Sequence, residues 1–437
     1  MRHGRRKKWL LSILLFIGVG VVLAAGGLFT YYKDFAKEDT HSAHRAESNH
    51  HSSKEGVHLN ADHQNSSTKI EPVTYYQDAD SVEEKVRRML ESMTLEEKIG
   101  QMLVVGFQST ESDEHIERMI RDYHAGGVIL FDRNMENPSQ VAKLTNQLQK
   151  IAYSSSLQIP LTFSVDQEGG AIIRMKEYFS SLPSQQALGE KGDKKAISKL
   201  AVRTGQQLAA MGFTINFAPV LDLSDTDSRS FGTDPLLTGE YGSEVISGLV
   251  AGGVTATVKH FPGNGRSNVD PHEDTSAVDA DQLDLENNDI YPFKKVIQEL
   301  NHDDFFVMVT HIKYPAYDKE HPASISPVIM QDLLRDQLGY TGIVVTDDLE
   351  MGAVNKYFTY EDLGCQAVSA GADMLLVCHT EESQKQVFNG ILEGVQSGEI
   401  PISRVDEAVE RILSYKYQHI TTIEADEEEA AKIVGDK

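Results

Sequence analysis

Cysteine is scarce in this sequence. Its 437 residues include only Cys365 and Cys378, too few for the disulfide framework that stabilises small secreted domains. Aromatic residues make up 8% of the chain and apolar residues 40%, which at this length is enough to bury one large core or two medium ones. We therefore expect side-chain packing, without covalent cross-links, to hold the fold together.

Positive charge is also in short supply. The chain has 41 Lys and Arg residues against 66 Asp and Glu residues, which gives a formal net charge of -25. A surface of this sign repels phosphate backbones. Nucleic acid is therefore not expected as a partner.

One stretch near the N-terminus has no charge at all. Residues 9–32 contain no charged side chain, and about 20 apolar residues suffice to cross a bilayer core. The basic residues within positions 1–8 would keep the N-terminus in the cytoplasm. The pattern predicts a transmembrane signal-anchor at 9–32, a single-pass protein of the cell membrane and an extracytoplasmic catalytic domain. Ala24 and Ala25 leave open a cleaved signal peptide and a secreted protein.

Composition divides the rest of the chain into three parts. Residues 33–80 are rich in His, Ser, Asn, Glu and Lys, which predicts a flexible linker because few apolar groups can offset the entropy of ordering. Residues 81–420 form the expected folded domain. Residues 421–437 include five acidic residues between Glu424 and Glu429 and predict a solvated acidic tail.

Short apolar, β-branched runs alternate with segments of helical period across residues 81–420, as in a parallel sheet wrapped by helices. Thr94 and Glu97 form a capping box at the start of one helical segment. Eight runs are predicted as strands: Met102–Gly106, Gly127–Phe131, Leu161–Val165, Ile215–Leu221, Val254–Val258, Phe305–Val309, Ile343–Thr346 and Asp373–Val377. This pattern predicts the α/β class and a (β/α)8 TIM-type barrel, although a doubly wound open sheet has similar local signals.

Polar residues at the ends of the predicted strands favour the barrel. They stand at or just beyond the C-terminal ends of different strands: Asp166, Asp222, Lys259 with His260, His311, Asp347 and His379. In a barrel these strand ends converge on one rim and would form one polar pocket, whereas an open sheet would spread them along an edge.

Three segments carry candidate chemistry. The carboxylates in Asp166–Gly170 could accept hydrogen bonds from substrate hydroxyls, or could simply cap a glycine-rich turn. The loop Lys259–Gly265 is followed by Asp270 and His272; a carboxylate beside an imidazole fixes its tautomer and favours the cation, giving a proton donor that can switch. Asp347 directly follows a buried strand, where a carboxylate can serve as nucleophile, base or metal ligand.

Together these segments resemble glycoside hydrolase family 3, and within it the β-N-acetylglucosaminidase (β-N-acetylhexosaminidase) branch that trims peptidoglycan fragments. The resemblance covers about residues 85–415 and rests on Lys259–Gly265 with Asp270 and His272, Thr346–Leu349, Asp166–Gly170 and Arg229–Gly232. It implies a (β/α)8 barrel with Asp347 as nucleophile and His272, paired with Asp270, as acid/base. It also implies that the sugar is bound by Asp166, Arg174, Arg229, Lys259, His260 and His311.

The sequence departs from the family pattern at three positions. Asn264 stands where the family usually has His, and Ala171 where it has Arg. Asn264 can hydrogen-bond but cannot titrate, so it affects loop geometry or tuning without removing the dyad. Between Asp270 and His272 stands Pro271, where Ser is frequent, and its ring stiffens the loop.

The expected function is retaining hydrolysis of terminal β-linked N-acetylglucosamine from cell-wall, peptidoglycan-derived glycans by a monomer, through a covalent glycosyl-enzyme and without cofactor or metal. Alternatives remain open. They are a β-glucosidase or an N-acetylglucosaminide phosphorylase of the same family, an inactive glycan-binding barrel, and a metal-dependent hydrolase. The last could draw on Asp166, His260, His272, His311 and Asp347, although their spacing resembles no metal-binding motif.

Overall fold

The computed structural model describes residues 73–79, 81–179, 182–267, 276–420 and 424–435. The chain divides into two units, residues 1–69 and residues 70–437. The first unit contains the expected basic segment, the expected anchor and most of the expected linker, and it lies outside the described residues. The description below concerns the second unit.

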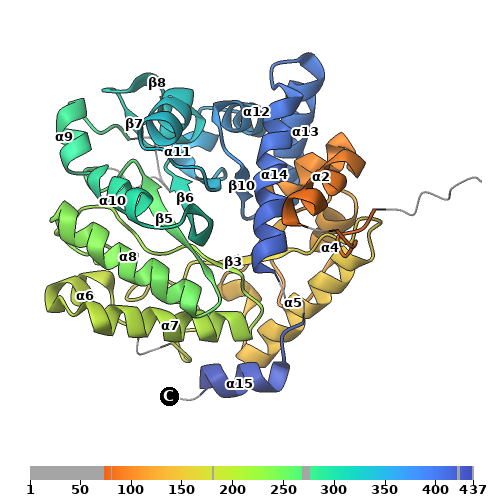
Figure 1. The fold of residues 1–437 in the computed structure, drawn as a ribbon, viewed down its shortest axis with the longest axis horizontal. Helices are drawn as coiled ribbons and strands as arrows, with labels where there is room; N and C mark the ends of the chain where they lie inside the picture. The colour runs from red at the N-terminus through yellow and green to blue at the C-terminus, as the bar shows by residue number, and fades with distance from the viewer. Residues whose placement is uncertain (1–72, 80, 180–181, 268–275, 421–423, 436–437) are drawn as a thin grey trace, which may run out of the picture. The chain divides into compact units, whose positions relative to one another are not determined.

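Eight parallel strands close into a barrel (Figure 1). Each strand pairs with the next one along the chain, and the first pairs with the last. In order around the barrel they are β1 (Leu103–Val105), β2 (Gly127–Ile129), β3 (Thr162–Val165), β4 (Ile215–Asn216), β5 (Thr255–Phe261), β6 (Phe305–Val309), β9 (Val344–Asp348) and β10 (Met374–Val377). Each overlaps one of the eight predicted runs, although β4 ends at Asn216 and β5 extends to Phe261. The (β/α)8 barrel is therefore confirmed and the open sheet is wrong.

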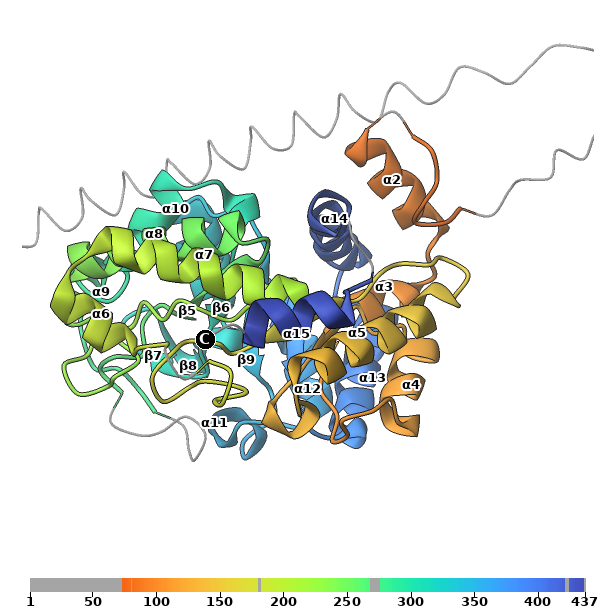
Figure 2. The ribbon, with the colours of Figure 1, turned by 90° about the horizontal axis from the view of Figure 1, so that it is seen from below.

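Helices surround the strands in both views of the fold (Figures 1 and 2). The α-helices are α2 (Val82–Ser92), α3 (Leu95–Gln101), α4 (Glu114–Arg121), α5 (Pro138–Tyr153), α6 (Gln185–Lys191), α7 (Lys194–Ala210), α8 (Pro235–Ala251), α9 (Gln282–Asn287), α10 (Tyr291–Glu299), α11 (Gly352–Asn355), α12 (Tyr360–Ala370), α13 (Glu381–Ser397), α14 (Ile402–His419) and α15 (Glu427–Gly435). The 3-10 helices are η1 (Asp132–Asn134), η2 (His302–Asp304) and η3 (Ala323–Ile325). The π-helix is η4 (Val328–Gln337). The predicted capping box is confirmed, because Thr94 and Glu97 exchange both of its hydrogen bonds at the start of α3.

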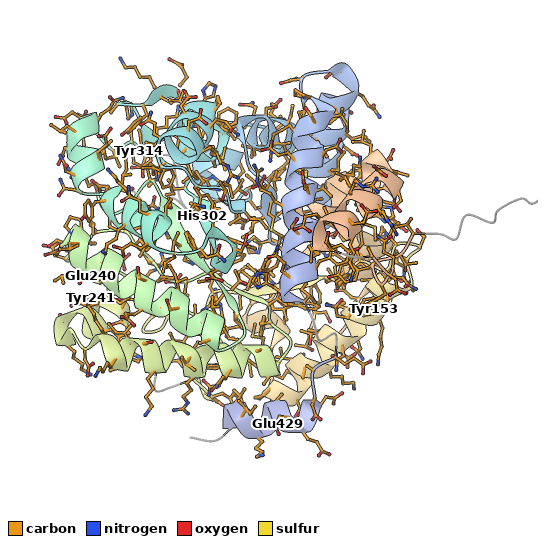
Figure 3. The ribbon with its side chains drawn as sticks, in the orientation of Figure 1. Tyr153, Glu240, Tyr241, His302, Tyr314 and Glu429 are labelled. Carbon is orange, nitrogen blue, oxygen red and sulfur yellow. The ribbon has the colours of Figure 1, made fainter. Side chains whose placement is uncertain are left out.

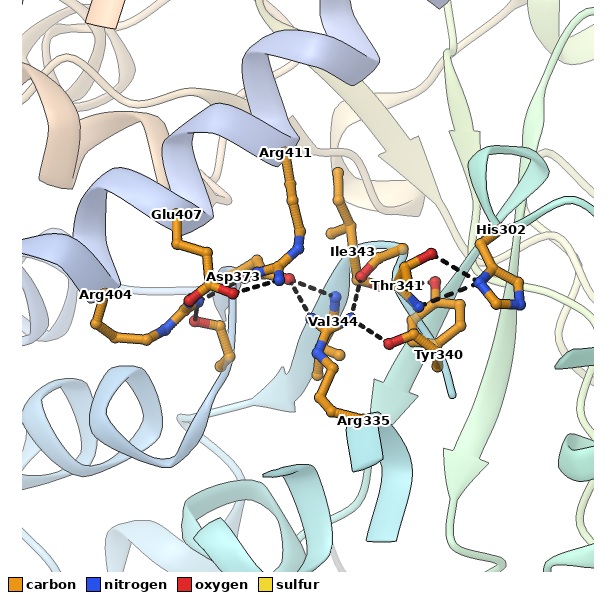
Figure 4. Close-up of polar contacts among 12 residues, drawn as sticks. His302, Arg335, Tyr340, Thr341, Ile343, Val344, Asp373, Arg404, Glu407 and Arg411 are labelled. Carbon is orange, nitrogen blue, oxygen red and sulfur yellow. Dashed lines mark hydrogen bonds and ion pairs between the residues drawn. The ribbon is translucent and has the colours of Figure 1, made fainter. Parts of the chain in front are cut away.

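A buried carboxylate ties α14 to the barrel at the N-terminal ends of the strands. Asp373, which directly precedes β10, is fully buried. Its oxygens accept hydrogen bonds from the guanidinium groups of Arg335 (2.7 Å), Arg404 (2.5 Å) and Arg411 (3.0 Å), as Figure 4 shows. The main-chain N–H of Val344 at the start of β9 adds a fourth bond, 3.0 Å long. This end of the barrel is therefore held by a charge network.

A two-stranded hairpin that the sequence pattern did not predict follows β6. It pairs β7 (Lys313–Tyr314) with β8 (Asp318–Pro322), and these short polar strands lack the apolar alternation that marks a strand in sequence. Tyr314, labelled in Figure 3, is fully buried, and its hydroxyl donates to the carbonyl of Gly263 (2.7 Å). The hairpin thus supports the loop that leaves β5.

The membrane-spanning part of the predicted fold class is corrected. None of the helices in the described part of the chain combines the length and the apolar surface that a membrane span requires. The longest of them, α14, has 18 residues and carries charged residues such as Arg404, Glu407 and Lys416, whereas a span needs about 20 mostly apolar ones. The expected anchor at 9–32 lies outside the described residues. The described residues thus form a barrel without a membrane-spanning helix, and the single-pass membrane localisation has no support.

Both ends of the described unit pack onto the barrel's helices. Tyr75, within the expected linker, is buried and stacks on Tyr417 of α14 with ring centroids 4.2 Å apart. In the expected acidic tail, α15 buries Ala430 and Val434, while Glu429, labelled in Figure 3, lies on its exposed side. These two segments are therefore partly structural, which their polar composition does not indicate.

Candidate active site

A cavity of about 350 Å³ opens at the C-terminal ends of the strands. In a (β/α)8 barrel this is the end at which loops from every strand meet. Its charged and titratable lining residues are Asp166, Glu168, Arg174, Arg229, Lys259, His260, Asp347, Asp348, Glu350 and His379. Six of these had been predicted as site residues from the sequence, and the barrel brings them together.

A larger cavity of about 430 Å³ lies at the opposite end, between α14 and the starts of β6 and β9. The cation lining it, Arg411, is already bonded to Asp373 and Glu407, and His302 is held by Thr341 (2.8 Å) and the carbonyl of Ile297 (2.8 Å). Because Arg411 and His302 already have these partners, and the cavity at the C-terminal ends of the strands gathers the predicted site residues, the latter is the better candidate for chemistry.

Four alternating charges form one wall of the candidate site. Lys259 of β5 lies 2.8 Å from Asp166 and 2.6 Å from Glu168. Arg229 donates two hydrogen bonds to Glu168, 2.7 and 2.8 Å long. Burial alone would raise the pKa of Glu168, but Lys259 and Arg229 outweigh it and lower that pKa to about 2. Glu168 was not singled out in the sequence, although it stands in the segment Asp166–Gly170.

Arg174 lines the cavity and lies close to two carboxylates. Its Nη1 lies 3.3 Å from Asp132 and its Nη2 lies 3.5 Å from Asp166. Its Nε is buried, with no hydrogen-bond partner among the described residues. A guanidinium held in this way can still donate to a sugar hydroxyl.

His260 is fixed by a residue that was not among the predicted site residues. Its Nδ1 lies 2.6 Å from Oδ2 of Asp222, and both side chains are buried. Asp222 also accepts the main-chain N–H groups of His260 (3.1 Å) and Asn264 (2.7 Å). The sequence had placed Asp222 at a strand end, but its partner could not be known before the strands were arranged.

The glycines of this loop allow the main chain to pack closely. A Cβ atom at Gly265 would lie 1.8 Å from the carbonyl oxygen of Leu223. Gly263 has φ of +134°, which side-chain-bearing residues rarely adopt, and a Cβ there would lie 2.9 Å from Asp289. Between these two glycines stands Asn264, one of the departures from the family pattern. Its side-chain oxygen is buried and has no hydrogen-bond partner in the described part of the chain.

Asp347 stands near the end of β9 and lines the cavity. Its Oδ1 accepts the main-chain N–H of Asp348 at 2.9 Å. Burial opposes its ionisation, but the neighbouring rings of His260 and His311, the Asp348 amide and Lys259 outweigh burial, so the pKa of Asp347 lies below its ordinary value. An ionised carboxylate at this position can attack an electrophilic carbon.

His311 is adjacent to the cavity but does not line it. It is fully buried; Ser324 lies 2.7 Å from its Nδ1, and its Nε2 lies 2.8 Å from the carbonyl oxygen of Asp348. Because a carbonyl only accepts, the hydrogen is on Nε2. Burial lowers the pKa of His311, which keeps the ring neutral. The predicted sugar-binding role is untested, and this geometry favours a role in positioning the turn beside Asp347.

Three further polar residues complete the rim on the far side of Asp347. Asp348 lies 3.1 Å from Nε2 of His379. Glu350 accepts the main-chain N–H of His379 (2.5 Å) and the hydroxyl of Thr380 (2.7 Å). The sequence had marked His379 as a strand-end residue without assigning it a role.

The expected acid/base dyad cannot be placed. Asp270, Pro271 and His272 lie outside the described residues. In the part of the chain that is described, no group of three or more His, Cys, Asp or Glu residues could hold a metal ion.

The sequence and the fold both match proteins of known family. Residues 94–415 match the glycosyl hydrolase family 3 N-terminal domain. The chain belongs to glycosyl hydrolase family 3. The resemblance seen in the sequence is thereby confirmed, and the chain is a glycosidase.

Named relatives of this family-3 chain are beta-hexosaminidases. Beta-hexosaminidase A of Pseudoalteromonas piscicida is 34% identical over 284 residues, which cover 60% of this chain but only 47% of that longer protein. A beta-hexosaminidase of Nitrosomonas eutropha is 35% identical over 277 residues, or 61% of this chain and 77% of that one. The structure of a glycoside hydrolase family 3 beta-N-acetylglucosaminidase from Paenibacillus sp. str. FPU-7 matches with a TM-score of 0.72 and 36% identity, covering 78% of this chain and 68% of that one.

Proposed function

We propose that this family-3 glycosidase removes terminal β-linked N-acetylglucosamine, with peptidoglycan-derived glycans as substrates, by a retaining mechanism. The observation that carries the proposal is Asp347, an ionised carboxylate in a cavity that Asp166, Arg174 and Lys259 also line. The beta-hexosaminidase relatives support the substrate class. Since every group in the described site comes from one barrel, one chain is sufficient.

In the first step an oxygen of Asp347 attacks the anomeric carbon and forms an ester bond, while the bond to the leaving oxygen breaks. The leaving oxygen takes its proton from His272, which Asp270 keeps in the protonated form. In the second step neutral His272 takes a proton from water, the water oxygen bonds to the anomeric carbon, and the ester is cleaved. General acid/base help of this kind contributes about 10²- to 10⁴-fold.

The described carboxylates support an acid that is not a carboxyl group. Retaining enzymes usually pair two carboxyl groups about 5 to 5.5 Å apart. Each of the other carboxylates around this cavity already accepts hydrogen bonds: Asp166 and Glu168 from Lys259, Asp348 from the main-chain N–H of Cys378 (3.2 Å), and Glu350 from Thr380. None of them is placed as a proton donor, which supports His272 in that role.

The first test compares hydrolysis of a chromogenic β-N-acetylglucosaminide with hydrolysis of the matching β-glucoside. We expect preferential cleavage of the N-acetylated substrate, and proton NMR should show the β-anomer as the first product. Asp347→Ala should abolish turnover, whereas Asp336→Ala, which removes an exposed carboxylate on η4, should not change it. An α-anomer as first product, or an active Asp347→Ala variant, would reject the mechanism.

The role of His272 needs a separate test. The His272→Ala variant should be slow with every substrate, but added azide should restore turnover of an activated substrate and give the β-glycosyl azide, because azide needs no general base. Failure of azide to restore turnover in a folded variant would count against His272 as the acid/base. Cleavage of neither substrate by the wild-type chain would favour the glycan-binding alternative.

A further inference from the structure

The cavity around Asp347 has two unlike halves. The half formed after β3, β4 and β5 holds the charged cluster of Lys259, Asp166, Glu168 and Arg229. The half formed after β9, β10 and β2 has an apolar wall with a thiol, formed by Ile129, Phe131, Met351, Leu376 and Cys378, beside the polar residues Asp348, Glu350 and His379. Charged donors and acceptors can hydrogen-bond to sugar hydroxyls. An apolar wall offers no such hydrogen bonds, but it can pack against a substituent that contains a methyl group.

Among the polar residues of this half, His379 is the one whose ring contacts the apolar wall. The ring of His379 stacks on Phe131, with centroids 5.6 Å apart and an interplanar angle of 29°. Its Nε2 lies 3.1 Å from Oδ2 of Asp348, and its main-chain N–H donates to Glu350 at 2.5 Å. Its main-chain carbonyl accepts from the side-chain amide of Gln108 at 3.1 Å. The ring is therefore held on one face, on one edge and through its main chain.

The remaining edge of this ring is available for a ligand. Nδ1 of His379 has no hydrogen-bond partner among the described residues, and the side chain is 42% exposed at the cavity rim. The hydrogen bond to Asp348 raises the pKa of His379, although burial works against it. Because the carboxylate of Asp348 only accepts, its contact places a hydrogen on Nε2 and favours the protonated ring, which carries a second hydrogen on Nδ1. In that form Nδ1 is a donor next to the apolar wall.

We propose that His379 is a specificity-determining residue, whose Nδ1–H donates to the carbonyl oxygen of the substrate's 2-acetamido group while the acetamido methyl lies against the apolar wall. This inference rests on the proposed function and deepens it, because it assigns the recognition of the N-acetyl group to one side chain. Asp348 acts as a positioning residue, since it holds the ring through Nε2, and Phe131 both supports the ring and forms part of the apolar wall.

Loss of the donor should affect one substrate and spare the other. A hydroxyl at C2 is shorter than an acetamido group and has no methyl to place against the apolar wall, so a glucoside gains little from His379. A hydrogen bond from a charged donor corresponds to roughly 10- to 100-fold in kcat/KM. His379→Ala should therefore lower kcat/KM for the N-acetylglucosaminide by that factor and change the value for the glucoside by less than about 3-fold.

The experiment measures kcat/KM for both chromogenic substrates, and inhibition by N-acetylglucosamine and by glucose, in the wild-type chain and three variants. His379→Gln retains an N–H donor of similar reach and should keep part of the discrimination. The matched control is His419→Ala, which removes a histidine lining the cavity at the other end of the barrel and should leave both substrates unaffected. Inhibition by N-acetylglucosamine should weaken in His379→Ala in parallel with kcat/KM.

The outcomes separate this inference from the proposed function. A substrate ratio unchanged in His379→Ala overturns the inference alone, whether both rates fall, as they would if His379 only supported Asp348, or neither does. Equal discrimination by the Ala and Gln variants overturns the hydrogen-bonding role. A wild-type chain that cleaves neither substrate overturns the proposed function and this inference with it.

Discussion

Nδ1 of His260 lies 2.6 Å from Oδ2 of Asp222. Because a carboxylate only accepts, the contact places a hydrogen on Nδ1 and leaves Nε2 of His260 for the cavity. The second oxygen of Asp222 accepts the main-chain N–H groups of His260 and Asn264. One buried carboxylate therefore fixes both the tautomer of His260 and the path of the loop that leaves β5.

Asp222→Asn should disturb the ring of His260 without changing the size of the side chain. An amide nitrogen facing Nδ1 would oppose the present tautomer. Loss of a hydrogen bond to a charged group corresponds to a fall of about 10- to 100-fold in rate. We expect kcat/KM for the N-acetylglucosaminide to fall by that factor. Asp336→Asn on the exposed face of η4 is the control, and equal activity of the two variants would contradict a role for Asp222.

His311→Ala should lower kcat and leave KM within about 3-fold of the wild-type value. Both ring nitrogens of His311 are engaged within the protein, and one of them holds the carbonyl of Asp348 beside Asp347. Loss of an interaction that acts on the nucleophile affects the transition state more than substrate binding. Steady-state kinetics decide the point: a raised KM with unchanged kcat would assign His311 to sugar binding.

Lys416→Met should make stability less dependent on pH. Lys416 is fully buried, and its ammonium donates only to the side-chain oxygen of Gln101 (2.7 Å) and the carbonyl of Gly126 (2.8 Å) among the described residues. Burial lowers its pKa to about 7, against about 10.4 in the unfolded chain. Between these values the unfolded state binds more protons, so the wild-type chain gains stability as pH rises from 7 to about 10.

Denaturant unfolding at pH 7 and pH 9 tests this expectation. The advantage of Lys416→Met over wild type should shrink by roughly 2 kcal/mol between the two pH values, since each pKa unit corresponds to about 1.4 kcal/mol. Lys143→Met, on the exposed side of α5, should follow the wild-type dependence. Parallel curves for all three chains would show that Lys416 does not titrate with folding.

Asp373→Asn should be the most destabilising of these substitutions. Burial opposes ionisation of Asp373, but Arg335, Arg404 and Arg411 outweigh it and lower its pKa. Removing the charge leaves three guanidinium groups without their common partner (Figure 4), and breaking a buried pair typically destabilises by about 3 to 5 kcal/mol. Glu299→Gln, which breaks the exposed pair with Lys295, should stay within about 1 kcal/mol. Equal losses in chemical unfolding would contradict this.

The eight strands could be predicted because burial on both faces leaves a continuous apolar run, as in Phe305–Val309 and Met374–Val377. The hairpin of β7 and β8 could not, since Asp318–Pro322 is polar and its pairing depends on the neighbouring loop. The packing of Tyr75 on Tyr417 also escaped prediction. A pair of adjacent tyrosines in a polar segment, Tyr75 and Tyr76, does not indicate which distant helix it will contact.

The candidate site divides in the same way. Asp166, Arg174, Arg229, Lys259, His260 and Asp347 were predicted and line one cavity. Glu168 and Asp222 were missed as site residues because their role lies in their partners, Lys259 and His260, which are distant in sequence. His311 differs: it follows a strand as the others do, yet both ring nitrogens bond within the protein and the residue does not line the cavity.

The sequence by itself determined the class of fold, the order of the strands and the family, because strand burial and the loop motifs depend on residues that are close together in the sequence. The tertiary structure decided which charges meet. Closure of the barrel places Asp348 of β9 beside His379 after β10, and Lys259 of β5 between Asp166 and Glu168 after β3. Side-chain pairing over such separations depends on strand register and loop path, and short-range periodicity contains neither.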